Sequence, residues 1–261
     1  MRAIFLGTGG YHPNDRRETA GIFLPEIGVL FDAGTGTYRL AEHLQTPELT
    51  IFLTHAHLDH VVGLTYLIPH LYLEKIKKLR LFGTAETLET VQNQLFSERL
   101  FPVKLPCEFI PLSADGTGPG IEVSPGVHVV SRRQPRHPGG SVGYRLDVSE
   151  TGQNGKDANS SRRLAYVTDT SDDPETVPFV RGVHVLVHEC YFPDAMQEWA
   201  VKTGHSHTTP VAQLAKEAGV GRLLLTHIDP LHPDPKEVEL PVARRIFPQT
   251  DLAEDQMSFD I

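Results

Sequence analysis

The sequence predicts an α+β fold in which two mixed β-sheets are flanked by helices. Two observations carry this prediction. Short apolar segments alternate with segments of helical periodicity and with turns containing glycine and proline along all 261 residues. The chain also divides into two halves of similar element order, about 1–118 and 119–261, although no period of 20–50 residues repeats in it. We expect the two halves to form a single domain over 1–261.

The first half contains four segments with the apolar composition of buried strands. They are Ile4–Leu6, Gly21–Leu24, Gly28–Asp32 and Thr50–Thr54. A helix is predicted over Gly63–Leu73, where apolar residues recur every three or four positions, and Pro69 is expected to bend it. A second helix is predicted over Thr84–Leu100, with acidic residues placed favourably near its start.

The second half begins near Pro119 and contains further apolar strands. They are expected at Val127–Ser131, Ser141–Val148, Leu164–Thr168, Val183–His188 and Arg222–Thr226. The segment Ser149–Arg163 is polar and predicts an exposed hairpin loop. A helix is predicted over Pro210–Ala218, with Thr209 as its N-cap and Gly219 at its end.

Composition excludes several classes of function. The 24 basic and 33 acidic side chains give a net charge of −9, which argues against a general affinity for a nucleic acid backbone. Cys107 and Cys190 are too few to form a disulfide scaffold, so we expect a cytoplasmic protein with two idle thiols. No apolar run reaches the roughly eighteen residues that a membrane-spanning helix requires, so no membrane partner is expected.

A cluster of metal-ligand side chains directly follows the apolar segment Leu49–Leu53. His55, His57, Asp59 and His60 lie within six positions, and the strand is expected to deliver them to one end of a buried sheet. Imidazole nitrogens together with a carboxylate oxygen suit zinc, iron or manganese. The spacing therefore predicts a metal site in preference to a set of ordinary polar histidines.

Three isolated residues near the ends of other apolar strands are candidates for further ligands. They are His137, Asp169 and His227. Each of them alone would be read as a turn residue, but two metals at bonding distance need about four protein ligands each, less the open positions. Together with the first cluster they predict a site for two metals. Asp32 is expected to support the metal-binding loops from its turn.

At this point the residues resemble the metallo-β-lactamase superfamily and, within it, the ribonuclease Z-like branch, over nearly the whole chain. Phe5–Gly10 and Leu30–Thr37 resemble the two glycine turns of that branch. His137 followed by Gly143 and Tyr144 resembles its H-x5-G-Y element. Val187–Phe192 resembles its H-E-A-T-F element, and Gly204–Ser206 resembles its G-H-S element. The resemblance implies the four-layer αββα sandwich of that superfamily, with a dinuclear site between the two halves.

The resemblance also implies a role for each site residue. One metal is expected on His55, His57 and His137, the other on Asp59, His60 and His227, with Asp169 bridging both. His205 is expected to steady the phosphate or protonate the leaving oxygen, and Glu189 to orient His205. The metals are expected to be two divalent ions, Zn²⁺ first, with Mn²⁺ or iron as alternatives. Asp59, as a ligand beside the nucleophile, is expected to take its proton.

The chain departs from the tRNA-processing members of that branch in one respect. Those enzymes carry a long flexible arm between the elements matched here by His137 and Asp169. Here the interval is 169 − 137 = 32 residues, and two strands use most of it. The remaining loop, Ser149–Arg163, is too short and too weakly basic to clamp a folded RNA. Cys190 also replaces the alanine of H-E-A-T-F, with little consequence for metal chemistry.

The sequence therefore predicts a dinuclear, metal-dependent hydrolase that cleaves a small cyclic or linear phosphodiester with a metal-bridging hydroxide. It resembles the arm-less cyclic phosphodiesterase of phosphonate breakdown. A tRNA 3′-end processing endonuclease (ribonuclease Z) is the first alternative, and a hydrolase of a carboxylic ester, thioester or lactone is the second. An iron redox protein would need a flavin domain for which the chain has no room, and a purely structural metal site would close its coordination.

Other properties stay open at this level. A small-molecule phosphodiester is the expected partner, and extended RNA binding is not expected. Many relatives dimerise, and the helix faces around Leu67–Leu73 are the surface available for a homodimer. The roles of His207 and of the cluster Arg132, Arg133 and Arg136 are also open: each is either solvated or close to the substrate.

Overall fold

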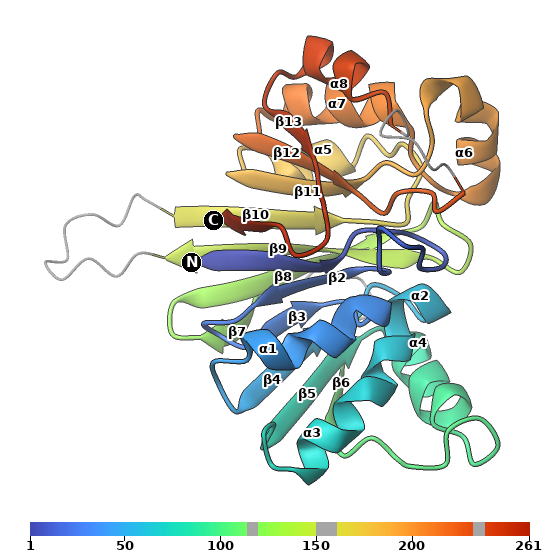
Figure 1. Cartoon of the computed structure of the whole chain (residues 1–261). Coiled ribbons are helices and arrows are strands. Elements are labelled where there is room, and N and C mark those ends of the chain that lie inside the picture. The colour runs from blue at the N-terminus through green and yellow to red at the C-terminus, as the bar shows by residue number, and fades with distance from the viewer. Residues whose placement is uncertain (114–119, 150–160, 232–237) are drawn as a thin grey trace, which may run out of the picture. The chain divides into compact units, whose positions relative to one another are not determined.

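The computed structural model describes residues 1–113, 120–149, 161–231 and 238–261. The chain forms two units, one of Met1–Ala114 with Glu254–Asp260 and one of Asp115–Ala253 with Ile261. Each unit contains one seven-stranded sheet (Figure 1). The predicted class of two mixed sheets flanked by helices is confirmed, and the prediction of a single domain stays a prediction.

The sheet of the first unit has the order β14-β1-β2-β3-β4-β5-β6. Its strands are β1 (Arg2–Gly7), β2 (Gly21–Leu24), β3 (Val29–Phe31), β4 (Glu48–Phe52), β5 (Lys78–Gly83), β6 (Glu108–Pro111) and β14 (Ser258–Asp260). The pairs from β14 to β3 are antiparallel, and those from β3 to β6 are parallel. The parallel strands therefore end at one common edge of this sheet, next to which ligand-binding residues usually lie.

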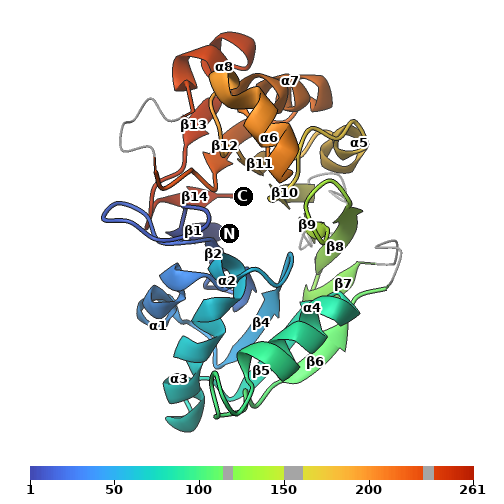
Figure 2. The ribbon, with the colours of Figure 1, turned by 90° about the vertical axis from the view of Figure 1, so that its right-hand side faces the viewer.

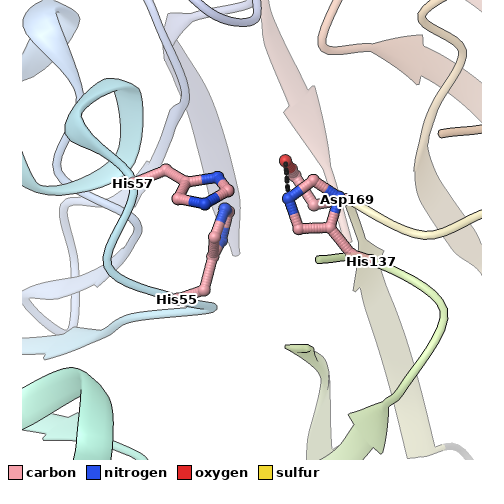
Figure 3. A group of neighbouring side chains, drawn as sticks. All are labelled: His55, His57, His137 and Asp169. Atoms are coloured by element: carbon pink, nitrogen blue, oxygen red, sulfur yellow. Dashed lines mark ion pairs between the residues drawn. The ribbon is translucent and has the colours of Figure 1, made fainter. Parts of the chain in front are cut away.

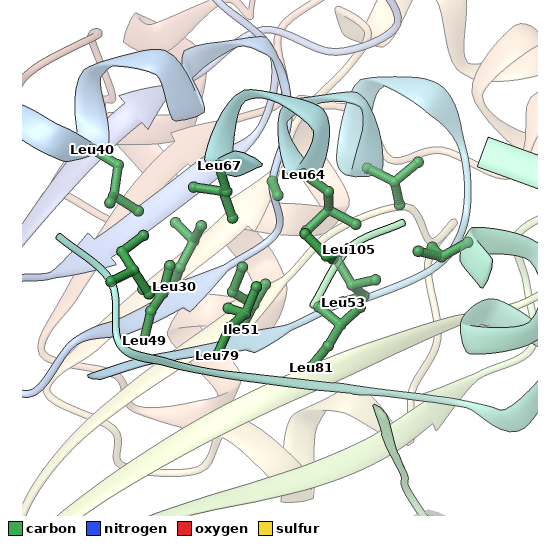
Figure 4. Packing of buried hydrophobic residues seen from close by; sticks show 14 of the residues in the cluster. Leu30, Leu40, Leu49, Ile51, Leu53, Leu64, Leu67, Leu79, Leu81 and Leu105 are labelled. Atoms are coloured by element: carbon green, nitrogen blue, oxygen red, sulfur yellow. The ribbon is translucent and has the colours of Figure 1, made fainter. Parts of the chain in front are cut away.

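Short helices cover one face of this sheet (Figures 1 and 4). They are η1 (Thr35–Arg39), α1 (Leu40–His43), α2 (Leu58–Val61), η2 (Val62–Leu67), α3 (Ile68–Tyr72), α4 (Ala85–Thr90) and the π-helical turn η3 (Val91–Leu95). Leu49 and Ile51 of β4, and Leu53 directly after it, alternate along the chain and point to this face, where they meet Leu64 and Leu67. This apolar layer anchors the loop that follows β4.

The carboxylate of Asp255, in the C-terminal segment, forms hydrogen bonds with three residues of the first unit. Asp255 accepts hydrogen bonds from Thr8 Oγ1 at 2.7 Å, from the backbone amide of Glu18 at 2.7 Å and from Arg39 Nη1 at 2.6 Å. Strand β14 then pairs with β1. Because the ion pair of Arg39 and Asp255 is largely shielded from water, removing one partner leaves a costly buried charge.

The sheet of the second unit has the order β13-β12-β11-β10-β9-β8-β7. Its strands are β7 (Ile121–Ser124), β8 (Val127–Gln134), β9 (Ser141–Ser149), β10 (Ser161–Val167), β11 (Val185–Glu189), β12 (Arg222–Thr226) and β13 (Thr250–Leu252). The pairs from β7 to β10 are antiparallel and those from β10 to β13 are parallel. This sheet therefore repeats the pairing pattern of the first, in line with the similar element order of the two halves.

The helices of the second unit are α5 (Thr176–Val180), η4 (Asp194–Met196), α6 (Gln197–Thr203), α7 (Thr208–Ala218) and α8 (Leu240–Ile246) (Figure 2). The apolar side of α7, with Val211, Leu214 and Ala215, packs with Leu223 and Leu225 of β12 in one buried cluster. That packing holds the ends of β11 and β12 in place. Among the described residues no helix is long and apolar enough to cross a membrane.

Several predicted elements differ from the structure. The predicted bent helix over Gly63–Leu73 is instead a 3-10 segment, η2, followed by α3. Pro69 lies in the first turn of α3, where the backbone N–H that proline lacks would have no partner within the helix. The predicted helix Thr84–Leu100 ends at Leu95 in a π-turn. Residues 150–160 of the predicted polar loop and the predicted boundary at Pro119 lie outside the described residues, while Arg162 and Arg163 belong to β10.

Candidate metal centre

The loop after β4 carries the ligand cluster of the first unit, and Asp32 supports it. Asp32 follows β3, is fully buried and has a left-handed backbone with φ of 56°. Its Oδ1 accepts a hydrogen bond from the backbone amide of Thr54 at 2.8 Å, and its Oδ2 lies 2.8 Å from His60 Nδ1. The expectation that Asp32 supports this loop is confirmed, since one carboxylate holds both of its ends, and that the loop binds metal stays a prediction.

These contacts also orient the imidazole rings. The carboxylate of Asp32 accepts a hydrogen bond from Nδ1–H of His60, which leaves Nε2 of that ring as the unprotonated nitrogen. The hydroxyl of Thr54 lies 3.0 Å from both oxygens of Asp32 and 3.0 Å from Nδ1 of His55. Because this hydroxyl donates to the carboxylate, it accepts from His55, and Nε2 of His55 is left as an acceptor. Thr54 is a residue that the sequence did not single out.

His57 and Asp59 complete the group in this unit. The ring centroids of His55 and His57 are 4.3 Å apart, and those of His55 and His60 are 4.4 Å apart. Asp59 Oδ2 lies 3.3 Å from Nε2 of His60 and accepts a hydrogen bond from the backbone amide of Tyr11 at 2.8 Å. Three imidazoles and one carboxylate are therefore gathered at the end of β4, as the spacing predicted.

In the second unit, Asp169 and His227 follow the parallel strands β10 and β12. Both have left-handed backbones, with φ of 52° and 56°, which aspartate and histidine adopt more readily than most residues. Asp169 Oδ1 lies 3.4 Å from Nε2 of His227. Both side chains are 2% exposed, and burying a carboxylate this deeply requires a charged or hydrogen-bonding partner.

His137 reaches the same carboxylate from the loop between β8 and β9. Its Nδ1 lies 3.2 Å from the backbone oxygen of Gly204, and its Nε2 lies 3.6 Å from Asp169 Oδ2. Figure 3 shows this ion pair and, in the first unit, the adjacent rings of His55 and His57. Burial lowers the pKa of His137, while Asp169 raises it in part, and the lowered pKa favours the neutral imidazole that metal binding requires.

Gly204 must be glycine for His137 to lie where it does. Its φ is 77°, and a Cβ on it would stand 2.7 Å from the backbone oxygen of Arg136 and 2.9 Å from Cα of His137. Behind the strand end, Gln134 Nε2 donates to the backbone oxygen of Thr168, and Ser141 Oγ donates to that of Asp169 at 2.8 Å. These contacts fix the backbone that carries the carboxylate.

Glu189 lies fully buried at the end of β11 and holds the loop that carries His205. It accepts hydrogen bonds from the backbone amides of Thr170 at 2.6 Å and Ser206 at 3.1 Å. Both of its oxygens lie 3.2 Å from Nδ1 of His205. Burial raises the pKa of Glu189, but His205 outweighs it through charge and hydrogen bonding, and the pKa falls below its ordinary value. The pairing that rested on resemblance alone is present in the structure.

Tyr191 is a site residue that sequence reasoning missed. Its ring stacks on that of His205, with centroids 4.7 Å apart and planes at 23°, and lies 5.6 Å from the ring of His227. It stands at the threonine of the H-E-A-T-F pattern, as Cys190 stands at the alanine. Two departures within one motif were the signal in the sequence that could have identified Tyr191.

His207 and the arginine cluster have structural partners. Nδ1 of His207 lies 2.7 Å from Asp194, which also accepts from the backbone amide of Thr209 at 2.8 Å. Helix α7 thus begins at Thr208, and its first turn is capped by Asp194; the expected N-cap role of Thr209 is wrong.

Within the arginine cluster, Arg132 donates to Asp173 at 2.6 Å and Arg136 lies 3.7 Å from the same side chain. The side chain of Arg133 is exposed. Much of the positive charge that this cluster offers is therefore compensated by one buried carboxylate.

The donor set fits divalent metals. In the second unit alone, one ligand atom each of Asp169, His205 and His227 lie within 4.8 Å of one another. In the first unit, Nδ1 of His55 and of His60 is engaged by a protein partner, which leaves Nε2 to bind a metal. Neutral imidazoles and carboxylates are the ligands that zinc, manganese and iron share. His/Asp groups able to bind metal are thus present among the described residues.

This chain is similar in sequence to one protein family and to curated members of its ribonuclease Z group. The model of the beta-lactamase superfamily domain matches residues 28–228. The ribonuclease Z of Methanosarcina mazei is 30% identical over 311 aligned positions, which cover 100% of this chain and 98% of that protein.

Two solved structures share the fold. The metallo-beta-lactamase fold protein YhfI from Bacillus subtilis has a TM-score of 0.76 at 20% identity, covering 99% of this chain and 98% of that one. The short form of human tRNase Z has a TM-score of 0.75 at 23% identity, covering 100% and 99%.

Proposed function

Because this chain belongs to the beta-lactamase superfamily and is a metal-dependent hydrolase of its ribonuclease Z-like branch, we propose that it cleaves small phosphodiesters with two divalent metals. The observation that carries the proposal is the pair of Glu189 and His205 beside Asp169 and His227. A carboxylate that holds one nitrogen of an imidazole leaves the other nitrogen to act as an acid towards a leaving oxygen.

The ligands are allotted as the resemblance implies. His55, His57 and His137 would hold one metal, Asp59, His60 and His227 would hold the other, and Asp169 would serve as a ligand to both. The oriented Nε2 atoms of His55 and His60 and the ion pairs of Asp169 support this allotment. We propose zinc as the metal, with manganese or iron as alternatives. Two such cations supply a nucleophile at neutral pH by lowering the pKa of water and stabilise negative charge on a phosphoryl oxygen.

The side chains of this chain then manage the protons. Asp59 is fixed by the amide of Tyr11, and its carboxylate accepts the proton of the attacking water. His205 donates the proton on Nε2 to the leaving oxygen. Glu189, held by the amides of Thr170 and Ser206, stabilises the charged imidazole before that transfer. A leaving alkoxide, which is strongly basic, needs such an acid more than a leaving phenolate does.

A second role for His205 is that of a metal ligand. Its grouping with Asp169 and His227 would suit a metal held by these three side chains. The two assignments differ in metal content. We propose the acid role, so His205→Ala retains the metal of the wild-type protein and loses turnover of esters that expel an alkoxide, whereas a ligand role predicts loss of metal as well.

The absence of an RNA-gripping arm supports small substrates. The alignment with the Methanosarcina mazei protein runs over 311 positions although this chain has 261 residues, so 311 − 261 = 50 positions of that relative have no counterpart here. The interval from His137 to Asp169, where the resemblance places the arm, is 32 residues. A net charge of −9 and an Arg132 bound to Asp173 also weaken the attraction of a long polyanion.

A tRNA 3′-end processing activity is the second candidate, and one observation favours it. Relatives named ribonuclease Z match this chain from end to end at 28–30% identity. RNA is the partner that this second candidate function implies. A homodimer is a further part of the proposal, and its test is the mass of the purified protein in solution.

One experiment separates the two substrates. The metal-loaded protein is incubated with precursor tRNA and, in parallel, with 2′,3′-cyclic nucleotides and bis(p-nitrophenyl) phosphate at the same moderate salt concentration. We expect turnover of the small esters and no specific cut in the precursor. A single cut at the 3′ end of the tRNA, with weak turnover of the small esters, would establish the second candidate instead.

A further inference from the structure

Tyr191 lies two residues beyond Glu189, and its ring covers one face of the imidazole of His205. The two rings are nearly parallel, at 23°, with centroids 4.7 Å apart. Near-parallel packing is one of the arrangements that aromatic rings favour. The same ring also lies 5.6 Å from that of His227, tilted by 46°. Tyr191 therefore contacts the proposed acid and the neighbouring ligand at once.

Glu189 anchors one edge of the imidazole of His205, with each of its carboxylate oxygens 3.2 Å from Nδ1. The residue before His205, Gly204, adopts a φ of 77°. The ring of Tyr191 adds a contact on the face of the imidazole, which the carboxylate at its edge does not supply.

We propose that Tyr191 is a positioning residue whose ring holds the imidazole of His205 in the plane that directs Nε2 towards the leaving oxygen. The proposal rests on the acid role of His205 in the proposed function. The ring is a feature of this chain, because the H-E-A-T-F pattern has a small threonine at that position. His205 is also nearly parallel to His227, at 5.5 Å and 24°, so the three rings form one cluster.

The consequence is a dependence on the leaving group. A diester that expels an alkoxide needs the proton of His205, whereas p-nitrophenolate is stable enough to leave without it. Loss of the Tyr191 ring should therefore slow the first kind of substrate selectively. A ring that merely supported the local fold would lower both rates together, since damage to the metal ligands affects every substrate.

The test compares Tyr191→Leu, Tyr191→Thr and Tyr191→Phe on 2′,3′-cyclic adenosine monophosphate and bis(p-nitrophenyl) phosphate. We expect Leu and Thr to lower kcat for the cyclic nucleotide about tenfold, with KM changed less than twofold and the p-nitrophenyl rate kept within twofold. Phe, which keeps the ring, should retain the wild-type values. Equal losses on both substrates, or a Phe variant as slow as Leu, would overturn the proposal.

The neighbouring Phe192→Leu serves as the matched control, because its ring lies 6.4 Å from that of His205 and is nearly perpendicular to it. It should lower both rates alike or neither. Metal content and Tm are measured for every variant.

A second readout does not depend on turnover. In metal-free protein labelled at histidine, the Cε1–H signal of His205, assigned with His205→Gln, should move in Tyr191→Leu and stay in place in Phe192→Leu. If no phosphodiester is cleaved by the wild type, the proposed function fails while this shift still tests the stack. An unmoved signal in Tyr191→Leu would refute the positioning role.

Discussion

Glu189 holds His205 by Nδ1, with both carboxylate oxygens 3.2 Å from that nitrogen. The carboxylate is itself fixed by two backbone amides, one from the loop after β10 and one from the segment before α7. Glu189→Gln removes this charge and keeps the size of the side chain, but its NH2 group cannot accept from one of the two amides, so Tm is measured together with activity.

We expect Glu189→Gln to lower kcat for an alkyl phosphodiester by about 100-fold or more, within the range that general acid–base groups contribute. Metal content should stay at the wild-type value, because Glu189 is not among the proposed ligands. The exposed Glu198→Gln on α6 is the control and should have no effect. Full activity in Glu189→Gln would show that the pair is only structural.

Asp32 is expected to set metal affinity without touching the metal. It orients His60 and, through Thr54, also His55. Substitution of such supporting residues usually weakens metal binding by about 10–100-fold. Titration of Asp32→Ala with zinc against a competing chelator should show this loss, whereas the exposed Asp15→Ala should bind like wild type. Equal affinities would remove Asp32 from the account.

Two left-handed glycines give a matched test of the loop that carries His205. At Gly219 a Cβ meets no atom within 4 Å, so Gly219→Ala should cost only the backbone strain, about 1–2 kcal/mol. At Gly204 a Cβ would also stand 2.7 Å from a backbone oxygen. Gly204→Ala should therefore lower the free energy of unfolding by clearly more and reduce bound metal, as His137 is displaced. Urea titration of both variants measures the difference.

The thiol of Cys107 should be inert at neutral pH. Burial, with a smaller effect of Glu108, raises its pKa to about 12 from an ordinary value of 9.0. Because the pKa of this thiol is higher in the native state than in the unfolded chain, the native state keeps the proton to a higher pH. The free energy of unfolding should thus fall as the pH rises from about 9 towards about 12, and be unaffected by this group below 9. Native protein should react slowly with a thiol reagent at pH 8, and unfolded protein fast; rapid native labelling of Cys107 would contradict the shift.

Much of the site could be predicted because its residues follow strands of strong apolar character. His55, Asp169 and His227 come directly after buried segments, and within each sheet the carboxyl ends of the parallel strands lie at a common edge. Short, half-exposed edge strands such as β6 and β7 lack that character, so their sequence does not distinguish them from loops. β5 mixes lysine and arginine with leucine, which hides a parallel strand.

Contacts made only on folding could not be predicted. Asp194 caps α7 from a position fifteen residues before Thr209, and no local pattern records that distance. The stacking of Tyr191 on His205 likewise depends on two loops that meet at the ends of different strands. Helix η3 ends in a π-turn because of the hydrogen bond from Phe96 to Val91, which periodicity alone does not foresee.

The most direct test of the central claim is the turnover of bis(p-nitrophenyl) phosphate by one preparation, measured together with its metal content. We predict about two divalent ions per chain, cleavage that stops on removal of the metal with a chelator, and recovery on addition of zinc or manganese. His57→Ala should lower both the metal content and the rate. A fully metal-loaded protein that cleaves no phosphodiester, or cleavage that persists without metal, would contradict the account.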